Sequence, residues 1–129
     1  MATLVNTGKV ISAKRIAGID SVPAVTYMAL GTDNTAEAAE DTALGAETSA
    51  EGLERAVATV VYEADYKTKW SHTFTNTSGI AVEVNEIGLC NAASASGSDL
   101  YMRHVFSSIV NILDSGSAEF IIREMHSQA

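Results

Sequence analysis

The residues of this chain that could do chemistry are one cysteine, Cys90, and three histidines, His72, His104 and His126. A cysteine nucleophile needs a neighbouring histidine or another cation to stabilise its thiolate, and a zinc site needs ligands at short, regular spacings. The histidines are too far apart in the sequence for a local zinc pattern. Cys90 follows Leu89 in an apolar stretch, which is typical of a small buried side chain. We therefore expect no catalytic residues, no metal site and no enzyme activity.

A cluster of acids offers a second kind of site, for a calcium ion, and it comprises Asp33, Glu37, Glu40 and Asp41. A dedicated calcium loop alternates Asp or Asn with a central glycine and ends on a glutamate, and this segment lacks that order. A pair of catalytic carboxylates would need a cleft that raises the pKa of one of them. We expect no bound ion or cofactor, and we interpret these acids as a solvated surface.

Composition and charge exclude several classes of partner. The 129 residues predict one domain, 1–129, and the 16 acidic and 8 basic residues give a net charge of −8. Direct nucleic-acid binding is not expected, because it requires clustered Lys and Arg. The sequence has no secretory leader and no apolar run of the roughly 18 to 20 residues that span a membrane, so we expect cytoplasmic synthesis and no membrane contact. A single cysteine excludes an internal disulfide.

Alternation of apolar and polar residues predicts β-strands over most of the chain. Residues Trp70, His72 and Phe74 share one face of such a strand, and we expect them to be packed or at an interface. Gly88, inside another strand, indicates a bulge or a close backbone approach. Short strands separated by turns are typical of an all-β antiparallel sandwich. The predicted strands are 24–30, 55–63, 66–76, 80–89, 100–109 and 118–125.

Two segments do not fit the strand pattern. Residues 7–18 predict a short amphipathic helix, capped by Thr7 and ended by Gly18, within an N-terminal segment 1–23; an extended arm is the alternative. Residues 31–54 are small, polar and acidic, and we interpret them as a long surface loop anchored by Leu44. A partial helix around 35–41 is an alternative within that loop, and so is an interaction surface.

Five short segments together resemble a group of small virion proteins of tailed bacteriophages. The segments are Met28–Asp33, Thr42-Ala43-Leu44-Gly45-Ala46-Glu47, Arg55, Asn85-Glu86-Ile87-Gly88-Leu89-Cys90-Asn91-Ala92-Ala93 and Tyr101-Met102-Arg103-His104-Val105-Phe106. Cys90 stands where the group usually has an aromatic residue. The resemblance implies a jelly-roll-like β-sandwich of the capsid cement or decoration type. Such proteins sit on the assembled shell and bind the major capsid protein.

The resemblance also covers tail, neck and fibre-attachment proteins, which are the alternative role. The expected location is the virion, at the capsid surface, and the expected assembly is a dimer or trimer of this chain. A shell component gains avidity from many copies, so each contact can be modest. Aromatic residues are the commonest interface anchors. The candidate interface residues are Trp70, His72, Phe74, Tyr101, Phe106 and Leu44.

Overall fold

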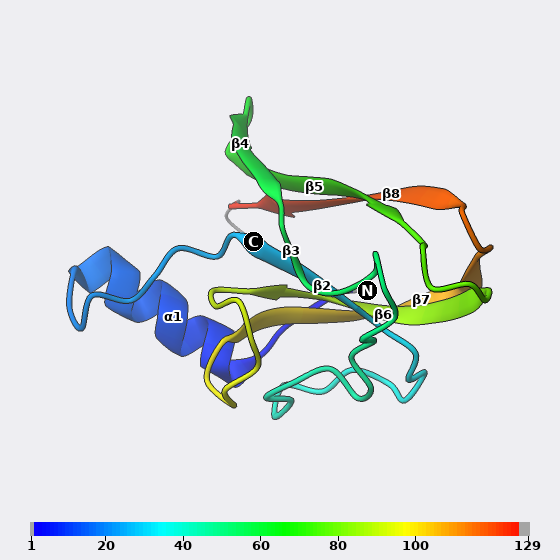
Figure 1. Cartoon of the computed structure of the whole chain (residues 1–129). Helices are drawn as coiled ribbons and strands as arrows, with labels where there is room; N and C mark the ends of the chain where they lie inside the picture. Colours follow the sequence, from blue (N-terminus) through cyan, green and yellow to red (C-terminus); the bar gives the residue numbers. More distant parts are fainter. Residues whose placement is uncertain (1, 127–129) are drawn as a thin grey trace.

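The computed structural model describes residues 2–126 and shows a mostly β protein with two antiparallel sheets and one helix (Figure 1). This confirms the predicted all-β sandwich, while the jelly-roll topology stays a prediction. The five-stranded sheet has the order β1-β7-β6-β2-β3, and the three-stranded sheet has the order β4-β5-β8. The strands are β1 (Thr3–Leu4), β2 (Tyr27–Gly31), β3 (Ala56–Val57), β4 (Thr59–Glu63), β5 (Lys67–Thr75), β6 (Val82–Cys90), β7 (Leu100–Ile112) and β8 (Ser117–Met125).

The predicted strand 55–63 is wrong as a single element. The chain leaves the five-stranded sheet after β3, which pairs with β2, and enters the three-stranded sheet as β4, which pairs with β5. Ala58 lies between them; it is buried, and its backbone N–H donates to the Thr26 carbonyl at 2.8 Å. Continuous alternation therefore hid a change of sheet, which takes place at the buried Ala58, while β4 itself is mostly exposed.

Helix α1 (Asn6–Ala17) confirms the helical interpretation of the N-terminal segment over the extended arm. Gly18 ends it at φ 67°, a left-handed conformation that glycine adopts without steric cost. The predicted cap is wrong: the helix begins after Val5, and the Thr7 hydroxyl donates to the Leu100 carbonyl at 2.6 Å. Gly8 allows a close approach to β7, since a side chain there would collide with the Tyr101 carbonyl.

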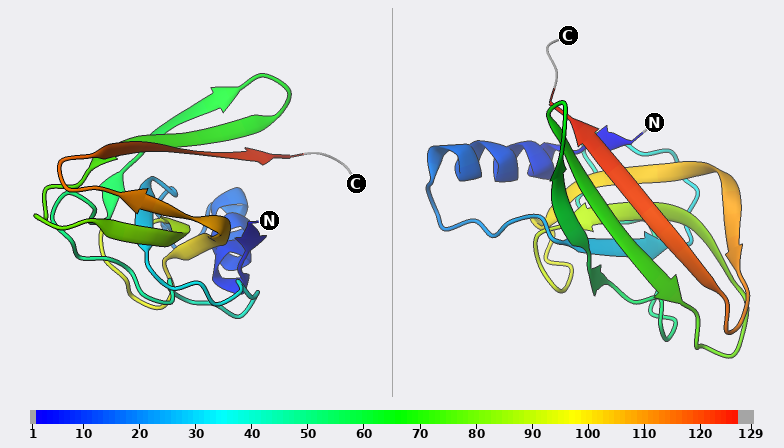
Figure 2. Two further views of the ribbon diagram at one scale, coloured as in Figure 1. Left: turned by 90° about the vertical axis from the view of Figure 1, so that its right-hand side faces the viewer. Right: turned by 90° about the horizontal axis from the view of Figure 1, so that it is seen from above.

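The five-stranded sheet is covered on both faces. One face packs against the three-stranded sheet through the main core, which includes Met28, Leu30, Trp70 and Phe74. Alternate residues of the same strands point to the other face and form a second cluster with residues of the N-terminal segment and the long loop. That cluster comprises Val5, Ala29, Leu44, Cys90 and Leu100. The long loop therefore acts as a third layer, as the two views of Figure 2 also indicate.

Candidate functional site

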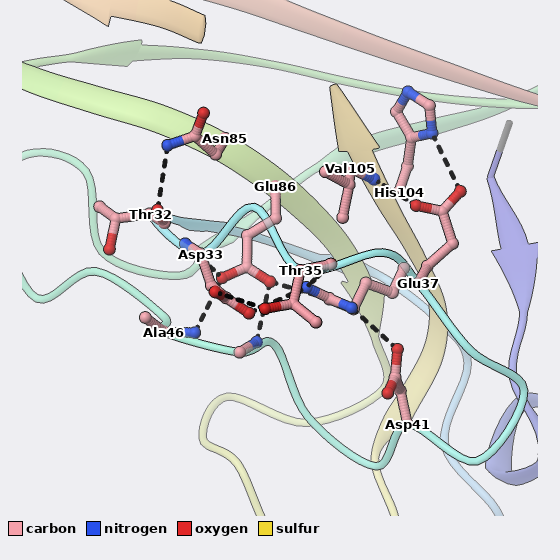
Figure 3. A network of polar contacts seen from close by, with 12 residues as sticks. Thr32, Asp33, Thr35, Glu37, Asp41, Ala46, Asn85, Glu86, His104 and Val105 are labelled. Carbon is pink, nitrogen blue, oxygen red and sulfur yellow. Dashed lines mark hydrogen bonds and ion pairs between the residues drawn. The ribbon is translucent and has the colours of Figure 1, made fainter. Parts of the chain in front are cut away.

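A buried carboxylate, Glu86 on β6, is the centre of the most extensive polar network in the described residues (Figure 3). Its side chain has no exposed surface. It accepts hydrogen bonds from the backbone N–H groups of Asp33 at 3.1 Å, Gly45 at 2.8 Å and Ala46 at 2.8 Å. Arg103 Nε, from the neighbouring β7, donates to the same carboxylate at 2.9 Å. Glu86 therefore joins two strands to two separate parts of the long loop.

The guanidinium of Arg103 carries the network outward into the loop. It lies 2.9 Å from an Asp41 carboxylate oxygen and 3.4 Å from one of Asp33, and it also donates to the Thr35 carbonyl at 2.9 Å. Burial lowers the pKa of Arg103, but hydrogen bonds to Glu86 and Asp41 outweigh it and raise the pKa above its ordinary value. Two of the four clustered acids thus bind an arginine, which corrects the solvated-surface interpretation for them.

Glu37 adds a further contact between the loop and β7. Its carboxylate accepts a hydrogen bond from the Val105 backbone N–H at 2.8 Å and lies 3.8 Å from His104 Nδ1. Val105 belongs to the stretch of β7 beyond the short pairing with β1, which covers only Met102 and Arg103. Glu37 thereby satisfies a backbone donor on an edge that no strand covers. The loop between Asp33 and Asp41 is irregular, so the alternative of a partial helix there is wrong.

Two glycines make this close approach possible. A side chain at Gly31 would collide with the Glu86 carboxylate, and one at Gly45 would collide with the carboxylate of Asp33. Both glycines belong to the segments that carry the resemblance. Gly88, predicted to mark a close backbone approach, packs against Leu44, where a Cβ would lie 2.9 Å from the Leu44 side chain. Leu44 anchors the loop as predicted, since it is buried in the second cluster.

A second network is centred on Arg55. Its guanidinium binds Glu47 through two nitrogens, at 3.0 and 2.7 Å, and Asp99 at 2.6 Å. Burial lowers the pKa of Arg55, but the hydrogen bonds to Glu47 and Asp99 outweigh it and raise the pKa. Burial raises the pKa of Asp99, yet hydrogen bonds from the Ser96 N–H and Arg55 hold that pKa below its ordinary value. This network fastens the far end of the loop to the β6–β7 connection.

The chemistry of both networks is structural. An arginine stays protonated at any physiological pH, so it cannot act as a general base. Each buried carboxylate already faces N–H donors, and no group of three or more metal-ligating side chains is found among the described residues. Breaking a buried, hydrogen-bonded ion pair costs about 3 to 5 kcal/mol, so each network holds the loop firmly in one position. The arrangement can present a rigid surface.

The predicted interface residues lie mostly in the interior of the chain itself. Trp70 and Phe74 belong to the main core, and Trp70 Nε1 donates to the Val25 carbonyl at 2.8 Å. Tyr101 is buried and donates its hydroxyl to the Glu124 carboxylate, and burial followed by this hydrogen bond raises its pKa. Leu44 is buried beneath the loop. These four side chains have little surface left for a partner, whereas His72 and Phe106 are half-buried.

The histidines and the cysteine lie in different surroundings. His72 stands edge-on to Phe74 with ring centroids 4.6 Å apart, and His104 packs in the same way against Phe106 at 5.3 Å. His126 is exposed, 3.3 Å from Glu124. Cys90 is fully buried, and burial is the main cause that raises the pKa of its thiol to about 12. A thiol held in its protonated form is a poor nucleophile.

Comparison with known protein families and with curated proteins finds no match. Within residues 2–126, no helix is long and apolar enough to cross a membrane. The assignment of a role therefore depends on the geometry above and on the segments that carry the resemblance. Four charged residues of those segments, Glu47, Arg55, Glu86 and Arg103, meet in the two networks. The sequence places these four residues in the resembling segments, but it did not predict that they pair with each other.

Proposed function

We propose that this chain is a structural component of a bacteriophage virion, a capsid cement or decoration protein that binds and stabilises the shell of the major capsid protein. The observation that carries the proposal is the structural role of the segments in which the resemblance was found. Their glycines and charged residues fix the long loop against a β-sandwich. The residues of these segments thus build a rigid scaffold, which is what a docking protein requires.

The surface supports a binding role as well. Large apolar side chains are exposed at many positions, and they include Ile16 at 85%, Tyr62 at 75% and Tyr66 at 69%. Scattered apolar residues are ordinary on a protein surface, but tyrosine is enriched among the residues that dominate protein–protein contacts. A rigid body that presents such side chains suits the many weak, symmetric contacts of a shell. An enzyme role has no comparable support.

The test uses expanded shells of the phage that encodes this chain, prepared from a deletion strain. Purified protein is added, and the shells are examined by co-sedimentation, thermal unfolding and electron microscopy. We expect saturable binding over the whole shell and a higher melting temperature of the shell. Density restricted to one vertex or to the tail would assign the chain to the neck, tail or fibre attachment instead. Lack of binding to any part of the particle would overturn the proposal.

A further inference from the structure

The charges of the exposed surface are segregated between the two ends of the molecule. Of the eight basic residues, Arg55 and Arg103 have side chains that are only 6% and 3% exposed, within the networks. All the others lie on α1, on the β4–β5 hairpin and on the last part of β8; they are Lys9, Lys14, Arg15, Lys67, Lys69 and Arg123. We call this region, residues 6–20, 60–69 and 121–126, the basic end. Six cations and four carboxylates give it a formal net charge of +2.

The opposite end of the sandwich is acidic. There the β5–β6 and β7–β8 turns meet, far from α1 (Figures 1 and 2). The residues of these turns and of the adjoining strand ends, 76–83 and 112–119, contain no cation. Their exposed carboxylates are Glu83, Asp114 and Glu119, and Glu51 joins them through a hydrogen bond to the Thr77 hydroxyl at 3.0 Å. We call this region the acidic end. Outside the basic end, twelve carboxylates and two arginines give a formal net charge of −10.

Each end also exposes apolar side chains. At the basic end, an open groove of about 410 Å³ runs between α1 and the three-stranded sheet. Its lining includes the apolar Ile11, Ile16 and Val60 and the charged Arg15 and Glu124. At the acidic end, the turn after β7 carries Leu113, which is 61% exposed, and Ile80 is 68% exposed. An exposed apolar turn and a partly apolar groove therefore occupy opposite ends of one chain.

We propose that the groove of the basic end is a docking site for a second copy of this chain, which inserts its acidic end. Contact between two basic ends would oppose like charges, and so would contact between two acidic ends. A head-to-tail contact places the +2 region of one copy against the exposed Glu83, Asp114 and Glu119 of the next. Such a heterologous contact generates a closed ring or an open chain of copies rather than a two-fold dimer. The contact is independent of any shell, so its failure would leave the proposed function standing.

Two variants, each altered at one end, test this contact by sedimentation velocity. Lys9→Glu with Ile16→Asp disables the basic end, and Glu83→Lys with Glu119→Lys disables the acidic end. All four side chains are exposed, so both variants should keep the wild-type circular dichroism and melting temperature. We expect wild-type protein to form assemblies larger than a dimer, and each variant alone to be monomeric. An equimolar mixture of the two should give dimers and nothing larger, because only one pair of intact ends remains.

Salt and a charge-matched control complete the experiment. The dissociation constant of wild-type association should rise about tenfold or more between about 0.05 M and about 0.5 M salt, because screening weakens contacts between exposed charges. Glu40→Lys with Glu54→Lys makes the same change in net charge as the acidic-end variant, on the long loop, and should leave association intact. A monomeric wild type at low salt would overturn the proposal. Self-association of either end variant, or a mixture that stays monomeric, would also overturn it.

Discussion

Replacing Glu86 with glutamine is the most direct test of how the long loop is held. The Glu86 carboxylate accepts four hydrogen bonds, three from loop backbone N–H groups and one from Arg103. A glutamine of the same shape keeps one acceptor oxygen and turns an NH₂ group toward donors. It also leaves Arg103, a residue that is 2% exposed, with only the partly exposed Asp33 and Asp41 as counter-charges. Removing one member of a buried pair costs about 3 to 5 kcal/mol, and we expect that loss in the free energy of unfolding.

Urea unfolding measures the loss, and limited proteolysis of residues 32–54 shows whether the loop is released. Glu83→Gln is the matched control, since it makes the same chemical change on the same strand at an exposed position; we expect it within about 0.5 kcal/mol of wild type. Arg103→Met should cost less than Glu86→Gln. It leaves Glu86 with three N–H donors, and it leaves Asp33 and Asp41, which are 30% and 25% exposed, able to bind water.

The double variant completes the cycle. Groups in one hydrogen-bonded network usually couple by about 0.5 to 3 kcal/mol, so Glu86→Gln with Arg103→Met should be less damaging than the sum of the two changes. A Glu86→Gln protein that is as stable as the Glu83→Gln control, with an equally protected loop, would refute this account of the network. So would strictly additive effects, because they would mean that Glu86 and Arg103 act independently.

Three further predictions address other parts of the chain. Cys90, buried with a thiol pKa of about 12, should not react with a thiol reagent near neutral pH until urea unfolds the protein. Asp99, whose pKa is lowered in the fold, stabilises the folded state at pH values above its unfolded pKa of about 3.9, and this stabilisation is lost as the pH falls. Acid should therefore destabilise the wild-type protein more steeply than the Asp99→Asn variant. Urea unfolding at a series of pH values measures the difference. Gly45→Ala should lower the free energy of unfolding by about 1 to 3 kcal/mol, because its methyl group would collide with Asp33.

The strands could be predicted because their signal is local. Alternation over β5 placed Trp70 and Phe74 on one face, and the structure buries both there. The same rule failed at Ala58, where one alternating run serves two sheets. A change of sheet depends on which strands pair with each half, and those partners, β2 and β5, lie on opposite sides of the run in the sequence. Local periodicity contains no information about that choice.

The networks could not be predicted as pairs, since Arg103 binds acids that precede it by more than 60 residues. A weaker signal was nevertheless present. Glu86 and Arg103 each stand in a strand where the flanking residues are mostly apolar, and a charge in such a setting must be paired. Two charges of opposite sign in such settings are therefore expected to pair with each other. The acids of the long loop were interpreted from composition alone, which does not reveal that two of them face an arginine.

Pairing also changes how the net charge of −8 should be interpreted. The two buried arginine side chains bind five carboxylates, Asp33, Asp41, Glu47, Glu86 and Asp99, so those acids are paired within the fold. The acids that remain for the surface lie largely away from α1, and the surface cations all lie near it. Folding thus converts a uniformly acidic composition into a molecule with two unlike ends. Unlike charges at the two ends of such a molecule favour head-to-tail contacts between copies over random aggregation.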